Sequence, residues 1–223
     1  MKPIALIGTL DTKGAEVRYV QGVIESQGCS VLLIDTGTLS SAEEAAITAK
    51  EIADAAGTTI EALREEGDRG KSVSAMCEGI AKIVRGLHDE GRISGVLSLG
   101  GSAGTSIGTA AMRALPVGVP KVQVSTLASG NTSPYVGTKD VTLMYSVVDV
   151  AGLNRISREI FRNAAGAICG MVKARETAEA IQDKPIVAAT MFGVTTPCVT
   201  RAREVLEEAG YEVLVFHATG SGG

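Results

Sequence analysis

Short apolar runs alternate with longer helical segments along the 223-residue chain, and this alternation constrains the fold more than any other feature. The apolar runs predict strands over Pro3–Gly8, Ser30–Asp35, Gly95–Leu99, Val119–Val124 and Val141–Met144. The helical patterns predict helices over Lys13–Gln27, Ser41–Ala55, Asp68–Glu90, Thr105–Ala114 and Asn154–Ala180. Strands that alternate with helices pair in parallel, and runs that are apolar throughout are typical of a sheet covered on both faces. The chain is therefore predicted to be an α/β protein with a parallel sheet and helices on both faces.

Local signals mark some of the boundaries. Gly28 is predicted to end the first helix as its C-cap, because glycine adopts the left-handed backbone at which many helices stop. Thr58 and Glu61 have the spacing of a capping box and predict the start of a further short helix. The stretch from Ser129 to Thr138 is rich in turn-forming residues and predicts an irregular connection.

A second α/β unit is predicted to begin at Lys184. The segment Lys184-Pro185-Ile186 repeats Lys2-Pro3-Ile4 at an offset of 182 residues, and matches in the following helix and strand keep that offset. The repeat is either a duplicated strand–helix–strand unit or chance convergence on the same pattern. Residues 1–180 are predicted to form one domain, and residues 184–223 the first unit of a second, incomplete α/β domain that is too small to bury its own core. We expect the chain to be a piece of a longer protein or one chain of a split protein.

Composition excludes several classes of function. Aromatic residues make up 3% of the chain, too few for a sugar-stacking lectin or a platform for single-stranded nucleic acid. The net charge of −4 argues against a general nucleic-acid-binding protein, which needs a basic surface. The apolar run after Met1 is too short for a signal peptide, and no apolar stretch approaches the length of a membrane span. Two histidines and four isolated cysteines, each cysteine expected as a small buried side chain, predict no metal site and indicate a reduced, cytoplasmic protein.

Four loops follow the predicted strands and are rich in glycine, serine and threonine. They are Gly8–Gly14, Asp35–Thr38, Gly100–Ser106 and Ser125–Asn131. In an open parallel sheet these loops meet beyond the carboxyl ends of the strands, which is where ligands bind. Glycine lets backbone N–H groups approach an anion closely, and helix N-termini and hydroxyls supply further donors. The loops therefore predict a site for a phosphate-bearing ligand, with ordinary turns and helix caps as the alternative.

Two acidic residues in these loops have both functional and purely structural interpretations. Asp11 is a candidate Mg²⁺ ligand or general base, or else the N-cap of the helix that follows. Asp35 stands where an acidic residue often binds a ribose, or else it only forms a turn.

No standard nucleotide-binding motif is present. Gly70-Lys71-Ser72 resembles the end of a Walker A loop, but Glu65 stands where that motif requires glycine. The spacing of Gly100, Gly101 and Gly104 does not match the G-x-G-x-x-G fingerprint either. The sequence therefore argues against a P-loop NTPase and against a standard NAD enzyme.

The segment Gly100–Gly104 does fit G-x-S-x-G, the nucleophile elbow of serine hydrolases. In that interpretation Ser102 is the nucleophile. The remaining members of the triad would be Asp140 or Asp149, followed by His217.

Four segments together resemble a known family. They are Ile7–Glu16, Gly67–Gly70, Leu99–Thr105 and Val124–Asn131. Through these segments, and over essentially its whole length, the chain resembles the ATP-binding family of the tomato mosaic virus resistance protein, which is widespread in bacteria. The resemblance implies an N-terminal Rossmann-like nucleotide-binding domain, bound ATP, a homodimer, and a second α/β domain that continues past Gly223.

Transferred position by position, the resemblance assigns the ATP site to the loops that were selected from their chemistry. The candidate binding residues are Gly8, Thr9, Asp11, Thr12, Lys13, Thr36, Gly37, Thr38, Gly100, Gly101, Ser102, Gly104, Thr105, Ser125, Thr126, Ser129, Gly130 and Asn131. Ser102, Thr105 and Lys13 are predicted to bind the phosphates, with or without Mg²⁺. Thr36 is predicted to flank the base or the ribose.

The leading expectation is an ATP-binding protein of unassigned activity, with a nucleotide and neither nucleic acid nor membrane as its partner. The second is an ATP-dependent enzyme that acts on a small acid bound between the two domains. Asp11, Asp140 or His217 would be its general acid or base. The third is the serine hydrolase that uses Ser102.

Overall fold

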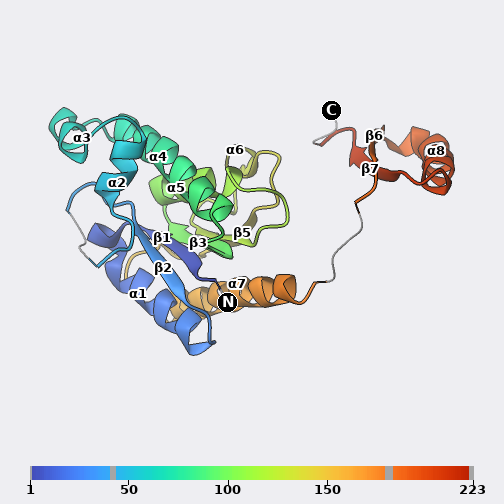
Figure 1. Ribbon diagram of the computed structural model, residues 1–223. Helices are drawn as coiled ribbons and strands as arrows, with labels where there is room; N and C mark the ends of the chain where they lie inside the picture. Colours follow the sequence, from blue (N-terminus) through green and yellow to red (C-terminus); the bar gives the residue numbers. More distant parts are fainter. Residues whose placement is uncertain (1, 41–43, 179–182, 221–223) are drawn as a thin grey trace. The chain divides into compact units, whose positions relative to one another are not determined.

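The computed structural model describes residues 2–40, 44–178 and 183–220 and divides into two units, Met1–Thr177 and Ala178–Gly223. The strands of the first unit (Figure 1) are β1 (Ile4–Gly8), β2 (Val31–Asp35), β3 (Gly95–Gly100), β4 (Lys121–Ser125) and β5 (Thr142–Tyr145). Its helices are α1 (Leu10–Ser26), α2 (Ala49–Ala55), α3 (Ile60–Glu66), α4 (Arg69–Asp89), α5 (Ser102–Arg113), α6 (Ser133–Val136) and α7 (Arg155–Glu176).

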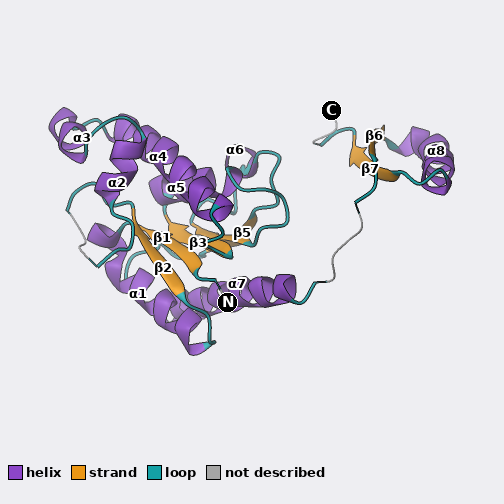
Figure 2. Ribbon diagram, in the orientation of Figure 1, coloured by secondary structure: helices purple, strands orange, loops and turns teal. Residues whose placement is uncertain are grey.

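The five strands form one parallel sheet in the order β2-β1-β3-β4-β5 (Figure 2). The predicted α/β fold with a parallel sheet is confirmed. From β1 the chain crosses in one direction to β2, and from β3 it crosses in the other direction to β4 and β5. The crossover direction therefore reverses between β1 and β3. In open parallel sheets, ligands bind at such a switch point, beyond the carboxyl ends of the strands.

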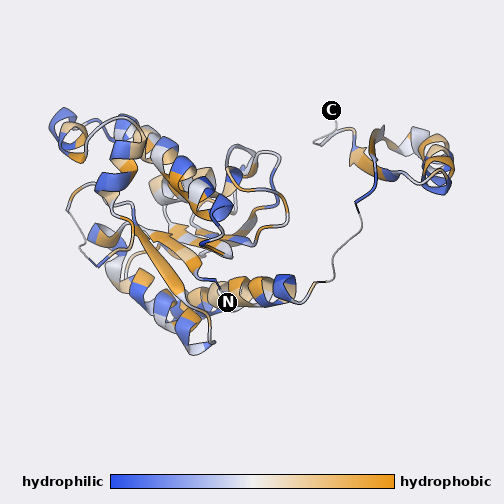
Figure 3. Ribbon diagram, in the orientation of Figure 1, coloured by the Kyte–Doolittle hydropathy of each residue, from blue (hydrophilic) through white to orange (hydrophobic). Residues whose placement is uncertain are grey.

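Helices cover both faces of the sheet. The helices α2, α3, α4 and α5 pack on one face around Ala5 and Ile7 of β1, and α1 and α7 pack on the other around Ile4 and Leu6 (Figure 1). Alternate residues of β1 thus belong to opposite cores, as the two-residue period of a strand requires. In Figure 3 the central strands are apolar while the helices carry both polar and apolar residues. The sheet is therefore buried on both faces.

Several predicted boundaries differ from the structure. The helix predicted over Ser41–Ala55 begins only at Ala49, because Ile47 instead forms a bridge with Ile34 of β2. Residues 41–43 lie outside the described residues, as do 179 and 180 at the predicted end of the last helix, whose described part ends at Glu176. Gly28 has a φ of 78°, which agrees with its predicted role as the helix terminator.

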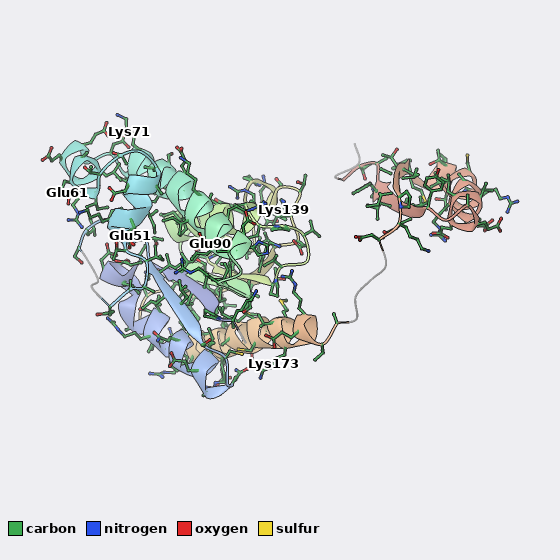
Figure 4. The ribbon with its side chains drawn as sticks, in the orientation of Figure 1. Glu51, Glu61, Lys71, Glu90, Lys139 and Lys173 are labelled. Atoms are coloured by element: carbon green, nitrogen blue, oxygen red, sulfur yellow. The ribbon has the colours of Figure 1, made fainter. Side chains whose placement is uncertain are left out.

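The capping box predicted at Thr58 and Glu61 is wrong. The helix α3 is capped by Thr59, whose side chain accepts a hydrogen bond from the N–H of Ala62. A capping box does occur one helix earlier, where Thr48 exchanges hydrogen bonds with Glu51 at the start of α2; of the two, Glu51 is labelled in Figure 4. Both candidate sites have threonine three residues before glutamate, so the spacing alone did not identify the box.

Two glycines of α4 are expected to respond oppositely to alanine. A Cβ on Gly79 would lie 1.9 Å from the carbonyl oxygen of Ile52 on α2, whereas nothing lies within 4 Å of a Cβ on Gly86. We expect Gly79→Ala to lower the free energy of unfolding by about 2–3 kcal/mol, because two packed helices must separate. Gly86→Ala should raise it by about 0.5–1 kcal/mol through helix propensity. Urea unfolding measures both, and a shift of both variants in the same direction would contradict this packing.

The second unit is a single strand–helix–strand motif. It contains β6 (Ile186–Met191), a 3₁₀ turn (Gly193–Thr195), α8 (Thr196–Glu208) and β7 (Glu212–His217), with the two strands parallel. The repeated elements occur in the predicted order, but the register differs by one residue. Ile4 pairs with Val31 in the first unit, whereas Ile186 pairs with Glu212, not Val213, in the second. None of residues 183–220 is fully buried.

The four cysteines are unpaired and differ in burial. Cys29 and Cys169 are buried, Cys77 is half-buried and Cys198 is exposed on α8, so the expectation of burial is wrong for Cys198. Burial and a hydrogen bond with Cys29 raise the pKa of the Cys169 thiol to about 12, so this thiol stays protonated at neutral pH. Within the described ranges, no helix has the length and apolar character needed to cross a bilayer.

Candidate functional site

A cavity of about 1150 Å³ lies at the switch point of the sheet in the first unit. Loops after all five strands contribute to its walls, together with α3 and the first turns of α4 and α5. The predicted binding residues that line it are Thr9, Asp11, Thr12, Lys13, Thr36, Thr38, Gly100, Gly101, Ser102, Gly104 and Thr126. The structure thus brings together residues from four loops that are far apart in the sequence.

The N-terminus of α5 opens into this cavity without a cap. Gly101 is the N-cap residue and supplies no side-chain hydrogen bond. The first N–H group to be bonded is that of Thr105, which donates to the carbonyl of Gly101 at 2.8 Å. The N–H groups of Ser102–Gly104 have no partner among the described residues, and all three residues line the cavity. Three free N–H groups and the positive end of the helix dipole favour an anion at this point.

The sequence prediction started this helix at Thr105, three residues too late. Gly100 explains the earlier start, because a Cβ there would lie 2.8 Å from the Cα of Gly104. The end of β3 and the first turn of α5 therefore touch backbone to backbone. Glycine at position 100 permits this contact, and α5 begins at Ser102 directly after the strand.

The start of α1 forms the opposite side of the switch point. Its N-cap is Thr9, not Asp11, and the N–H groups of Thr12 and Lys13 both donate to the carbonyl of Thr9. The backbone of Lys13 is non-helical, with φ −127° and ψ 17°. The Asp11 carboxylate accepts a hydrogen bond of 2.9 Å from the N–H of Leu39, which ties the β1 and β2 loops together.

Asp35 does not line the cavity. It is fully buried at the end of β2, where its Oδ1 accepts hydrogen bonds from the N–H groups of Leu10 (2.9 Å) and Gly37 (2.8 Å). These bonds hold the starts of α1 and of the β2 loop in place. The interpretation of Asp35 as a turn-forming residue therefore agrees with the geometry, and the ribose-binding interpretation does not.

Other predicted residues also lie outside the cavity lining. Thr105 was predicted to bind phosphate, but it is fully buried and its hydroxyl lies 2.7 Å from the hydroxyl of Ser125. Gly8 and Gly37 are buried, and a Cβ on either would lie within 2.5 Å of a neighbouring side chain. Thr105, Ser125, Gly8 and Gly37 are therefore packed beneath the loops and do not line the cavity.

The distal part of the β4 loop lies on the surface. Ser129, Gly130 and Asn131 are exposed and do not line the cavity. The Asn131 side chain instead accepts hydrogen bonds from the N–H and hydroxyl of Ser133 at the start of α6. Of this loop only Thr126 and Leu127 reach the cavity.

The segment after β5 also lines the cavity, and sequence reasoning missed most of it. Tyr145 is 42% exposed, and the hydroxyl of Ser146 is buried with no hydrogen-bond partner among the residues that the structure describes. Val147 has a φ of 62°, and the N–H of Val148 donates to the carbonyl of Ser146 at 2.6 Å, which makes a strained turn. A strand is predicted over residues 141–144, and the rule applied to the loops after the other strands would also have selected residues 145–149.

The corner between α3 and α4 contributes cations. Arg64, Gly67, Arg69 and Ser72 all line the cavity, and none was among the predicted binding residues. Gly67 has a φ of 65° and ends α3. The segment Gly67–Gly70 was part of the family resemblance, and that was the available signal for this wall.

The triad residues proposed for a hydrolase are not gathered in the first unit. Asp140 lies at the opposite edge of the sheet, where its carboxylate is 2.7 Å from Nζ of Lys121, the first residue of β4. Partial burial acts to raise the pKa of Asp140, but hydrogen bonds from Lys121 and the Gly118 N–H hold it below its usual value. Asp149 and Ser102 do line the cavity, but no histidine does within the described residues.

No cluster of three or more histidine, cysteine, aspartate or glutamate side chains with metal-binding geometry occurs in the described part of the chain. Asp11 and Asp149 are the acidic residues that line the cavity. A divalent cation would therefore be held largely by the phosphates of a ligand and by water, as is common for Mg²⁺.

Comparison with known proteins follows the same two units. Residues 2–177 match the family model described as "Uncharacterised protein family (UPF0261) N-terminal domain", and residues 184–223 match the model of the C-terminal domain of that family. The chain belongs to the UPF0261 family. The predicted resemblance to the family of the tomato mosaic virus resistance protein is confirmed, because that tomato protein is among the relatives of this chain.

Members of this family occur in bacteria and plants. The chain is 53% identical over its whole length to a UPF0261 protein of Clostridium tetani and 47% identical to one of Rhizobium meliloti. It is 38% identical, over 97% of its length, to the ToMV resistance protein Tm-1(GCR237) of Solanum lycopersicum. It spans 55% and 54% of the two bacterial relatives and 31% of the plant protein. The chain thus corresponds to the N-terminal part of larger proteins.

Proposed function

We propose that the first unit binds ATP in the cavity at the switch point. The observation that carries this proposal is the uncapped N-terminus of α5, which presents the N–H groups of Ser102–Gly104 to the cavity. A second, independent feature is Ser146, whose buried hydroxyl has no hydrogen-bond partner in the described part of the chain although the residue lines the same cavity. A polyanionic ligand with further polar groups would satisfy both features.

The phosphates would lie between α5 and α1. Lys13 faces this space and forms no ion pair within the described residues. The hydroxyls of Ser102, Thr12 and Thr126 are further donors along the same side of the cavity. This strip is made of short side chains and free backbone groups, which allows phosphate oxygens to approach closely.

The base would lie at the β4–β5 end of the cavity. Tyr145 is the aromatic residue that lines the cavity in the described part of the chain, and its ring is 42% exposed. Leu127 and Val147 lie in the same wall. Aromatic and aliphatic side chains of this kind pack on the faces of a base.

Isothermal titration of the chain with ATP–Mg²⁺ and with inorganic tripolyphosphate tests the proposal and this orientation together. We expect Tyr145→Ala to weaken ATP binding about tenfold, because stacking on one aromatic ring contributes about 1–3 kcal/mol, and to leave tripolyphosphate binding unchanged. Tyr135→Ala, on a residue outside the cavity lining, is the control. The absence of any heat from ATP would refute the proposed function, and equal loss of both ligands in Tyr145→Ala would refute the orientation.

A further inference from the structure

The cavity is larger than one ligand usually requires, and its walls are of two kinds. Its volume of about 1150 Å³ exceeds the range of about 300–1,000 Å³ that is typical of small-molecule sites. The polar strip that would hold phosphates comes from the loops after β1, β3 and β4. A further part of the wall comes from α3, α4 and the second turn of α5 and has a different chemistry.

Apolar side chains form most of this second wall. Leu63 of α3, Val73 and Met76 of α4 and Ile107 of α5 line the cavity and belong to, or pack against, the core beneath it. None of them can hydrogen bond, so the phosphates of a nucleotide gain nothing on this side. Leu63, Met76 and Ile107 are already buried, whereas Val73 is half-buried, so a ligand group that covers Val73 removes apolar surface from water.

Two arginines stand beside the apolar wall. The Nε of Arg64 donates to the carbonyl of Thr38 at 2.6 Å, which fixes the side chain and leaves its terminal N–H groups for another partner. Arg69, on the first turn of α4, forms no ion pair within the described residues. Gly67, with its left-handed backbone, forms the short corner that places both arginines at the cavity.

The acidic residues nearest to Arg69 in the sequence have other partners. The Asp68 side chain caps α4 by accepting from the N–H groups of Gly70 (2.8 Å) and Lys71 (3.1 Å). Glu66 forms an ion pair with Lys71, which is labelled in Figure 4. The positive charge of Arg69 is therefore available to a ligand in the cavity.

We propose that the cavity has a second subsite, next to the nucleotide, for a small carboxylic acid with an apolar body. Its carboxylate binds Arg69 and Arg64, and its body covers Val73. Arginine matches a carboxylate with paired N–H groups, whereas an uncharged ligand would leave both guanidinium groups unpaired. This subsite rests on the proposed function, because the nucleotide occupies the polar strip. It lies within the first unit.

Hexanoate is a suitable probe, with hexan-1-ol as its uncharged analogue. In titrations of the whole chain saturated with ATP–Mg²⁺, we expect hexanoate to bind at least about tenfold more tightly than hexan-1-ol, because only the carboxylate forms charge-assisted hydrogen bonds with the arginines. Arg69→Gln should weaken hexanoate about tenfold by the same reasoning and change ATP affinity less than about twofold. Arg92→Gln, which removes an exposed arginine beyond the other end of α4, is the matched control.

Three results would overturn the second subsite. They are displacement of hexanoate by ATP, equal affinity for hexanoate and hexan-1-ol, and an Arg69→Gln variant that loses ATP as strongly as hexanoate. The last result would assign Arg69 to the phosphates. Failure of the nucleotide proposal is detected separately, by titrating ATP into the same protein without hexanoate.

Discussion

Replacing Gly101 by aspartate is expected to weaken ATP binding by about 100-fold or more without loss of stability. A Cβ at position 101 meets nothing closer than Oγ1 of Thr126 at 3.9 Å, and the φ of −76° suits any residue. Aspartate is a favoured N-cap, so its carboxylate would accept from the free N–H groups of α5 and complement the helix dipole. It would thereby occupy the proposed phosphate position with a negative charge. Like charges about 4 Å apart repel by about 4 kcal/mol near a protein surface, enough for the predicted loss.

Gly101→Asn is the matched control, because asparagine has the same shape without the charge. It should cap α5 equally well and weaken ATP several-fold less than aspartate does. The melting temperatures of both variants should equal or exceed that of the parent chain, which thermal unfolding measures. If Gly101→Asp is stabilised and still binds ATP with unchanged affinity, the N-terminus of α5 is not the phosphate site.

The fold was predictable because its signals are local and periodic. Ile4–Gly8 is apolar at every position, and only a strand buried on both faces tolerates such a run. Gly28 marked the end of α1 because a φ of 78° is unfavourable for other residues. Capping was less predictable, since Thr48 and Thr58 both precede a glutamate by three residues, yet the helix after Thr58 is capped by Thr59.

The site was predictable at the level of loops and not of side chains. The rule that ligands bind beyond strand carboxyl ends selected Thr9, Lys13 and Ser102 correctly as residues that line the cavity. It also selected Thr105, whose hydroxyl is buried against Ser125, because composition does not show which way a side chain in a loop points. Arg69 was not selected because it lies at the start of α4 and not in a loop that follows a strand. The packing of α4 beside the cavity is tertiary, and the pattern of strands in the sequence does not indicate it.

The interpretation of Asp35 leads to the largest expected effect on stability. Its Oδ1 accepts from Leu10 N and Gly37 N, and the residue has no exposed surface. Asp35→Ala leaves two buried N–H groups without an acceptor, and each such group costs about 1–3 kcal/mol. We expect a loss of about 4 kcal/mol in the free energy of unfolding, a large share of the roughly 5–15 kcal/mol that stabilises a typical domain.

Two comparisons separate this acceptor role from a general effect of lost charge. Asp35→Asn keeps an oxygen at the Oδ1 position and should cost about 1 kcal/mol, since the two N–H groups stay bonded. Asp54→Ala removes an exposed carboxylate from α2 and should be nearly neutral. Denaturant unfolding of the three variants gives the order of their free energies of unfolding directly.

Because Asp35 holds the start of α1, which carries Lys13, Asp35→Ala should also weaken ATP binding under conditions where the variant remains folded. An asparagine variant as unstable as the alanine variant would show that the carboxylate charge, and not its geometry as an acceptor, stabilises this edge of the sheet.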